Sequence, residues 1–117
     1  MGHEIKALQQ LTVIKAQSFS ARFLGLHGIE KNQRQHTVLW FPQCRAVQSF
    51  FLTSQHTLVF LDIHYHVLSP YQIMYANRCY WSFKAVHAVE LPALFSSYSH
   101  ELLQSSLDIL LSRARSV

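Results

Sequence analysis

Two short segments of this chain carry the side chains best suited to chemistry. In the first, Cys44 stands next to Arg45, and a guanidinium beside a thiol favours the thiolate, which is the nucleophilic form of cysteine. A cysteine nucleophile also needs a base, which His56 or His87 could supply. Alternatively, Cys44 is a small buried residue entering a strand. The sequence leaves both interpretations open.

The second segment alternates a carboxylate with two imidazoles at Asp62, His64 and His66. In an extended strand these three side chains would share one face, and such a ligand set suits Zn²⁺ or Fe²⁺. If the segment is the tip of a hairpin, the alternation need not hold and the side chains are solvated. The sequence does not place a fourth ligand.

Arg45 also has a structural interpretation. The chain has only six acidic residues, and two of them, Asp62 and Glu90, lie at predicted strand ends among apolar neighbours. A charge in such a place needs a partner. This interpretation predicts a partly buried ion pair between Arg45 and one of these carboxylates.

The elements that must position these residues are mostly short strands. Apolar runs rich in β-branched and aromatic residues, separated by turn residues, predict them. The predicted strands are Leu11–Ala16, Thr37–Phe41, Arg45–Leu52, Leu58–Leu61, Val67–Leu68, Ile73–Tyr75, Tyr80–Phe83 and Ala85–Leu91. We expect the runs at 45–52 and 58–61 to be paired strands of the core.

Two segments have helical spacing instead. Ser18–Leu26 predicts a short helix, and the tail predicts a helix from Ser99, a suitable N-cap, to Ala114. The tail has two apolar stripes: Phe95, Tyr98 and Leu102, and Leu103, Leu107, Leu110 and Ala114. One stripe would pack on the sheet, and the other could meet another protein or a second copy of the chain.

Composition limits what the chain can be. Its 117 residues form one domain, with a β core at 11–93 and a helical extension at 94–117. Half of the residues are apolar, so the core needs no metal or disulfide, and we expect no cofactor. The net charge of +4 is spread along the chain, which argues against nucleic-acid binding. The absence of a membrane span or signal peptide favours a cytoplasmic protein.

Seven aromatic residues in the middle of the chain have two interpretations. They could stack on a ligand or on bases. At strand spacing, however, aromatic residues more often form the core, and this is the interpretation that we prefer. The seven are Trp40, Phe41, Phe50, Phe51, Tyr80, Trp81 and Phe83.

Four motifs occur in an order and at spacings that resemble one family. They are Arg22-x-x-Gly25-Leu26, Leu39-Trp40-x-x-x-Cys44-Arg45-Ala46-Val47-x-Ser49-Phe50-Phe51-Leu52, Val59-Phe60-Leu61-Asp62 and Ala85-Val86-His87-Ala88-Val89-Glu90-Leu91. Together they resemble the family called domain of unknown function 192, over roughly Leu11 to Ala93. The resemblance implies a compact, mostly antiparallel β fold of jelly-roll type with a short helix near its start. It implies no established activity.

The chain departs from the pattern of this family at polar positions. Gln48 stands where the family usually has a His, and Thr57 stands where it usually has an Asp. The turn after Asp62 lacks the usual Gly. If the His and Asp of the family formed a polar site, this chain has lost both, which favours a diverged or purely binding role.

The sequence therefore predicts a mostly β domain, a compact antiparallel sandwich or barrel of jelly-roll type with a short N-terminal helix and a C-terminal amphipathic helix. Its expected role is non-enzymatic, as a binding or protein-interaction module that self-associates or binds another protein through the tail helix. The alternative is a small-molecule or metal-dependent enzyme with a site at the mouth of the barrel. The candidate binding residues are Cys44, Arg45 and Asp62, and the candidate metal ligands are Asp62, His64 and His66.

Overall fold

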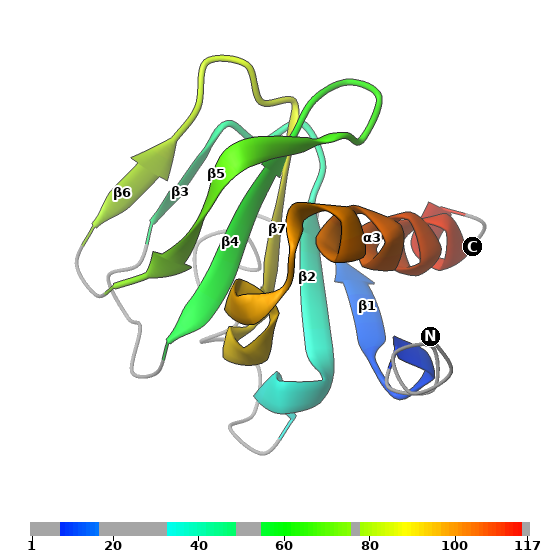
Figure 1. The fold of residues 1–117 in the computed structure, drawn as a ribbon. Helices are drawn as coiled ribbons and strands as arrows, with labels where there is room; N and C mark the ends of the chain where they lie inside the picture. The colour runs from blue at the N-terminus through cyan, green and yellow to red at the C-terminus, as the bar shows by residue number, and fades with distance from the viewer. Residues whose placement is uncertain (1–7, 17–32, 49–54, 76–77, 116–117) are drawn as a thin grey trace.

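The fold is mostly β with one C-terminal helix (Figure 1). The computed structural model describes residues 8–16, 33–48, 55–75 and 78–115. Its elements are β1 (Thr12–Lys15), η2 (Arg34–His36), β2 (Thr37–Phe41), β3 (Ala46–Gln48), β4 (His56–Leu61), β5 (Val67–Met74), β6 (Cys79–Trp81), β7 (His87–Pro92), η3 (Ala93–Ser97) and α3 (His100–Arg115). The predicted helix at 18–26 lies outside the described residues.

The strands form two sheets. A five-stranded sheet has the order β1-β2-β7-β4-β5, and β3 pairs with β6 in a separate two-stranded sheet. The pairs β2–β7, β4–β7, β4–β5 and β3–β6 are antiparallel, whereas β1 runs parallel to β2, with Thr12 opposite Thr37. The larger sheet is therefore mixed, where the sequence predicted antiparallel strands.

The prediction that the runs at 45–52 and 58–61 pair with each other is wrong for the described part of these runs. β3 pairs with β6, so that Val47 lies opposite Tyr80, and β4 lies between β5 and β7. The alternation of side chains shows that a run is a strand, but it does not show which strand is its neighbour. Here β7, which is distant in sequence, occupies the central position beside β4.

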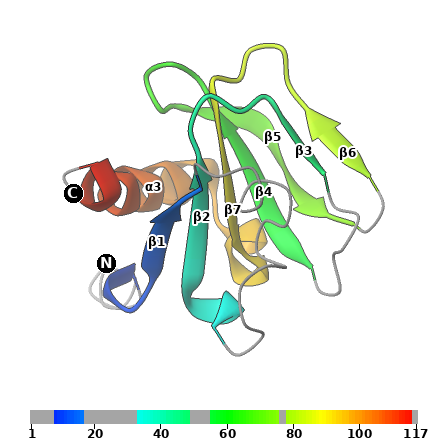
Figure 2. The same ribbon diagram turned by 180° about the vertical axis from the view of Figure 1, so that it is seen from behind.

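The core lies on both faces of the five-stranded sheet, because alternate residues of β2, β4 and β7 point to opposite sides. On one side, Trp40, Val59 and Val89 pack with Leu residues of α3. On the other side, strand residues such as Phe41 pack with Tyr80 of the two-stranded sheet. Figures 1 and 2 show α3 beside β1 and the β3–β6 pair toward the opposite end of the sheet.

The tail helix begins and ends within one residue of its predicted bounds. The Ser99 hydroxyl accepts a hydrogen bond from the N–H of Leu102 at 3.1 Å, which confirms Ser99 as the N-cap. Arg113, near the other end, donates to the carbonyl oxygens of Leu8 and Leu11 at 3.3 and 2.8 Å. Both ends of the helix are thus fixed by hydrogen bonds. No helix among the described residues has the length and apolar character needed to cross a membrane.

One strand replaces the two that the sequence predicted at 67–68 and 73–75. β5 runs without interruption past Pro70, although proline cannot donate to a sheet. The pairing with β4 shifts at this point, because Leu58 lies opposite Gln72 but Phe60 lies opposite Leu68. β5 is the last described strand of the sheet, and its pairing is irregular at this point. Both are situations in which a strand tolerates proline.

Candidate functional site

The predicted site segments around Cys44 and Asp62 meet at one end of the five-stranded sheet. Cys44 donates its backbone N–H to the carbonyl of Val86 at 2.9 Å, and Val86 donates to the carbonyl of Leu61 at 2.8 Å. These bonds join the loop after β2, the end of β4 and the residue before β7. The motif that contains Cys44 and the motif that ends at Asp62 are thus connected through the motif at 85–91.

The side chain of Cys44 has a structural environment. It is half-buried against the core, and its thiol donates to the carbonyl of Ala46 at 3.1 Å. The geometry therefore agrees with the interpretation of Cys44 as a small residue entering a strand.

Arg45 does not form the predicted buried ion pair. Its side chain is exposed, and the described residues show no ion pair between Arg45 and Asp62 or Glu90. Glu90 is buried in β7, opposite Leu58 of β4. The charge of Asp62 is satisfied locally instead, by the backbone of its own turn.

The segment from Asp62 to His66 is the tip of the β4–β5 hairpin. One carboxylate oxygen of Asp62 accepts hydrogen bonds from the N–H groups of His64 and His66, each at 2.9 Å. Partial burial raises the pKa of Asp62, but the two amide bonds and the nearby imidazoles of His66 and His64 together outweigh it and hold the pKa below its ordinary value. Asp62 therefore stabilises the turn as a carboxylate.

The imidazoles of His64 and His66 are exposed, with ring centroids 6.0 Å apart. The second oxygen of Asp62 lies 3.7 Å from Nδ1 of His66. In the part of the chain that the structure describes, no group of three or more His, Cys, Asp and Glu side chains is arranged to hold a metal ion. The metal site at Asp62, His64 and His66 thus rests on the sequence alone.

His87 holds two loops at this end of the sheet. Its buried ring stacks on Tyr65, with centroids 4.3 Å apart and planes 8° apart, and its Nδ1 accepts the N–H of Gln43 at 3.2 Å. Gln43 and Tyr65 both have positive φ, 54° and 64°, which is unfavourable for residues other than glycine. His87 thus stabilises both strained positions, and its Nδ1 is occupied by this contact rather than free to act as a base.

Gln104 of α3 fixes the same turn from the other side. Its amide oxygen accepts the N–H of Val67 at 2.7 Å, and its amide nitrogen donates to the carbonyl of Tyr65 at 3.0 Å. A side-chain amide that makes two bonds to one backbone segment restricts its position. This end of the sheet is therefore built to hold its loops in place.

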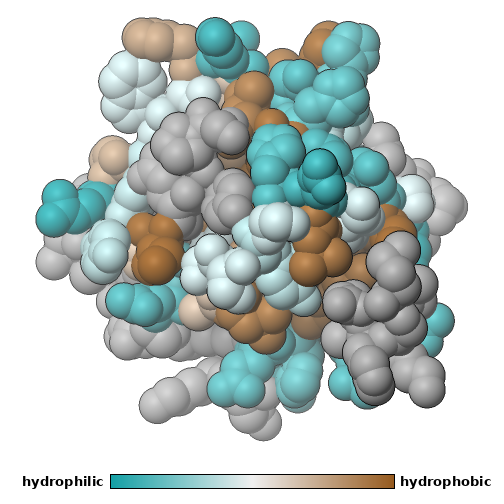
Figure 3. Space-filling view, in the orientation of Figure 1, coloured by the Kyte–Doolittle hydropathy of each residue, from teal (hydrophilic) through white to brown (hydrophobic). Residues whose placement is uncertain are grey.

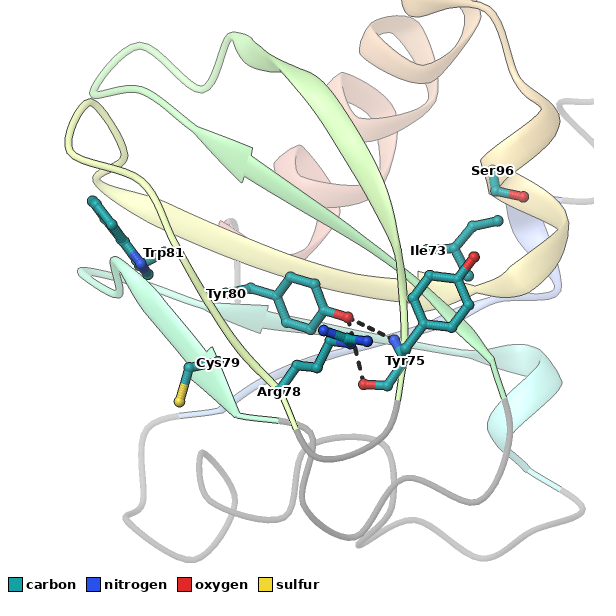
Figure 4. Close-up of a pocket in the computed structure, with 7 residues that line it drawn as sticks. All are labelled: Ile73, Tyr75, Arg78, Cys79, Tyr80, Trp81 and Ser96. Carbon is teal, nitrogen blue, oxygen red and sulfur yellow. Dashed lines mark hydrogen bonds between the residues drawn. The ribbon is translucent and has the colours of Figure 1, made fainter.

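A different region, which the sequence analysis missed, forms a groove in the surface. A groove of about 760 Å³ runs over the edges of β5 and β6 and is open to solvent (Figure 4). We call it the β5–β6 groove. Its described lining residues are Ile73, Tyr75, Arg78, Cys79, Tyr80, Trp81 and Ser96.

Tyr80 links the two strands that border the groove. Its buried ring packs in the core, and its hydroxyl oxygen accepts the N–H of Tyr75 at 2.7 Å and lies 3.4 Å from the carbonyl of the same residue (Figure 4). The hydroxyl thereby satisfies both backbone groups of Tyr75, at the point where β5 ends. The side chain of Tyr75 itself is 54% exposed.

The preferred interpretation of the aromatic residues as core is wrong at two positions. Trp81 is 58% exposed and Phe83 is 80% exposed, with ring centroids 4.5 Å apart in an edge-to-face arrangement. Trp40, Phe41 and Tyr80 are buried, as predicted. The two-stranded sheet packs on the core through one face, so Tyr80 points inward and its neighbour Trp81 points to solvent.

Arg78, directly before β6, is the one basic or acidic residue among the described residues that line the groove. Arg45 and Lys84 are also exposed, but they lie in the loops at the other end of β6 and do not line the groove.

Comparison with known proteins identified no similar protein. No family model matches this chain, and no curated protein or solved structure matches it either. The resemblance to the domain of unknown function 192 family therefore depends on the four motifs and their spacing.

Proposed function

We propose that this protein is a non-enzymatic protein-interaction module that binds its partner in the β5–β6 groove. The observation that carries the proposal is an open groove that presents Tyr75, Arg78 and Trp81 at the surface. Tyrosine, arginine and tryptophan are the residue types enriched where protein interfaces concentrate their binding energy.

Burial of Trp81 alone would contribute substantially to binding. With 58% of this residue exposed, a partner could remove roughly 120 Å² of it from water. At about 25 cal/mol per Å², this burial is worth about 3 kcal/mol before the costs of association. A partner that also covers Phe83 and Tyr75 would gain more.

The enzymatic alternative receives less support from its own candidate residues. The thiol of Cys44 donates to a backbone carbonyl, and one carboxylate oxygen of Asp62 accepts two backbone amides. Nδ1 of His87, a candidate base, also accepts a backbone amide. Each of these groups thus has a structural role in holding the loops around it.

Self-association through the tail helix is also less well supported than binding in the groove. Leu103, Leu107 and Leu110 are fully buried in the core, and Ile109, with 39% of its surface accessible, is the most exposed large apolar residue of α3. On the face that carries α3, apolar side chains form separate patches among polar ones (Figure 3). The helix contributes its apolar surface mainly to its own domain.

We also propose that the fold is a diverged form of the jelly-roll type implied by the resemblance to domain of unknown function 192. Two observations support this. The two-stranded sheet packs on one face of the larger sheet through shared core residues, among them Phe41 and Tyr80. Three of the motifs lie together at one end of the molecule, linked through Cys44, Leu61 and Val86.

Selection from a displayed library of protein fragments tests the proposed function. The full chain is the bait, and the affinity of each purified fragment is then measured for the wild type, Trp81→Ala, Arg78→Glu and Ile63→Ala. Ile63 is 67% exposed and lies in the β4–β5 turn, outside the groove, so it is the matched surface control. We expect losses of about tenfold or more for the two groove variants and no change for the control. Fragments that bind all four proteins equally would contradict the proposal.

A further inference from the structure

One histidine ring contacts both strained backbone positions of the described structure. Among the described residues, Gln43 and Tyr65 are the two non-glycine residues with positive φ, at 54° and 64°. Gln43, in the β2–β3 loop (residues 42–45), donates its N–H to Nδ1 of His87 at 3.2 Å, and Tyr65 stacks on the same ring with centroids 4.3 Å apart. Residues other than glycine stay in this region only where the surrounding structure holds them, and such strain often marks a segment that switches. His87 is therefore the shared contact of two strained loops.

The contact between His87 and Gln43 requires a neutral imidazole. A ring nitrogen that accepts an N–H must carry a lone pair, whereas both nitrogens of an imidazolium carry hydrogen. Protonation of His87 would therefore bring two N–H donors face to face, with their nitrogens 3.2 Å apart. This conflict arises at Nδ1 whatever group Nε2 contacts. The residue is also only 7% exposed, so an open loop that lets water reach the ring favours its charged form.

The two loops differ in what else holds their strained residues. The β4–β5 turn has two further anchors, because the Asp62 carboxylate accepts two of its amides and Gln104 of α3 donates to the carbonyl of Tyr65. The stack on Tyr65 can also hold an imidazolium, because the face of an aromatic ring attracts a cation. Gln43 lies two residues beyond the end of β2, and the bond from its N–H to His87 fixes the backbone there. Protonation should therefore release the β2–β3 loop and leave the turn in place.

Other charged groups lie on the elements around His87. The titratable or charged side chains on these elements are Lys15 of β1, Arg45 of the β2–β3 loop, Asp62, His64, Tyr65 and His66 of the turn, Lys84 before β7, Glu90 on the opposite face of β7 and Asp108 of α3. The carboxylates of Asp62 and Asp108 already accept hydrogen bonds, from the turn and from α3. Trp40 packs edge to face on His87 at 6.3 Å, and Nζ of Lys15 lies 5.1 Å from the centroid of Trp40. A protonated His87 would thus be a second cation beside the same indole.

We propose that His87 is a pH-sensitive latch on the β2–β3 loop. When His87 is neutral, its Nδ1 holds the N–H of Gln43 and the loop is closed on the end of the sheet. When His87 is protonated, it releases Gln43, whose backbone leaves the strained conformation, while the turn and α3 stay folded. Because the open loop binds the proton of His87 more tightly, the closed form is complete above the titration range of histidine and is lost as the pH falls through that range. The latch does not use the β5–β6 groove, so the failure of either proposal leaves the other standing.

Nitrogen NMR of the full chain between about pH 4.5 and about pH 8 tests the latch. We expect Nδ1 of His87 to be unprotonated at the upper end and to gain a proton within this range. The protection of the Gln43 amide from hydrogen exchange, corrected for the exchange rate of an unfolded amide at each pH, should fall about tenfold per pH unit below the midpoint. The amide of Tyr65, which bonds to the carbonyl of Asp62, and that of Leu107 in α3 should stay protected. The range lies above the ordinary pKa of 3.8 for Asp62, so the turn keeps its carboxylate throughout.

Two variants separate the latch from other titrating groups. His87→Asn supplies an acceptor oxygen that does not titrate, so Gln43 should stay protected over the whole range. His64→Asn is the matched control, because its imidazole is exposed in the adjoining turn, and the loss of protection at Gln43 should remain unchanged. An equal pH dependence in His87→Asn, or its loss in His64→Asn, would overturn the latch.

The titration of the wild type gives an independent decision, even where His87→Asn fails to fold. The latch is wrong if Nδ1 of His87 is protonated at about pH 8, or if it gains no proton above about pH 4.5. It is also wrong if Gln43 keeps its protection while His87 gains its proton. Loss of protection at Leu107 at the same pH as at Gln43 would show unfolding of the whole domain and would contradict a local release.

Discussion

The Asp62 carboxylate should be the main local determinant of the β4–β5 turn. Asp62→Ala removes an acceptor of two amide hydrogen bonds of 2.9 Å. Bonds to a charged group contribute about 1.5–3 kcal/mol each when they are well shielded. The side chain of Asp62 is 30% exposed, so water replaces part of this energy. We expect a loss of about 1.5 kcal/mol in the free energy of unfolding and a fall of about 6 °C in Tm.

The stability lost in Asp62→Ala should depend on pH, and the direction follows from the pKa of Asp62. The pKa of Asp62 is lowered from its ordinary 3.8 in the folded protein. Its contribution is therefore present above the pKa of the unfolded chain, and it disappears as the pH falls through the lower folded value. The difference in stability between the wild type and Asp62→Ala should be retained at pH 5 and shrink below about pH 3.8.

Thermal unfolding followed by circular dichroism between pH 2.5 and pH 7 measures both effects. Asp62→Asn keeps an acceptor oxygen without the charge and should lose less than Asp62→Ala. Arg45→Ala is the matched control, because Arg45 is exposed and pairs with no described carboxylate. An unchanged Tm in Asp62→Ala would refute the role of the carboxylate. An equal, non-additive loss in Arg45→Ala would restore the ion pair that the sequence predicted.

Two further predictions concern the tail helix. Leu107→Ala removes a fully buried side chain and should cost about 3 kcal/mol in urea denaturation, whereas Ile109→Ala, at a position that is 39% exposed, should cost less than about 1 kcal/mol. Equal losses would contradict the buried stripe. Ser99→Ala removes the acceptor for the N–H of Leu102 and should cost about 1 kcal/mol in thermal unfolding. Ser105→Ala, at an exposed position within the helix, should cost nothing, and a matching loss there would refute the cap.

Local signals in the sequence predicted the elements that depend on near neighbours. The strand at Thr37–Phe41 has its predicted bounds, because Pro42 stops an apolar run. The tail helix follows from its cap at Ser99 and its apolar period. The sequence also indicated a turn after Asp62, and the side chain of Asp62 bonds to the backbone of that turn.

Features that depend on distant residues escaped the sequence analysis. The pairing of β4 with β7 joins Leu58 to Glu90 across more than thirty positions. The parallel pairing of β1 with β2 has no local signal either, because both strands show the same side-chain alternation in either direction. The surroundings of the candidate residues also depend on tertiary packing: the thiol of Cys44 and the carboxylate of Asp62 bond to backbone groups near them, and Trp81 and Phe83 are exposed.

By itself, the sequence determined that this chain is a mostly β domain with a capped C-terminal helix and a polar turn after Asp62. Only the tertiary structure decided which strand faces are covered and that a groove forms between β5 and β6. The β5–β6 groove takes residues from β5, β6 and η3, and the alternation along β6 predicts two faces without showing which is covered. Which face of a strand is covered depends on how distant segments of the chain pack together. The same local pattern therefore buries Tyr80 in the core and leaves Trp81 at the surface.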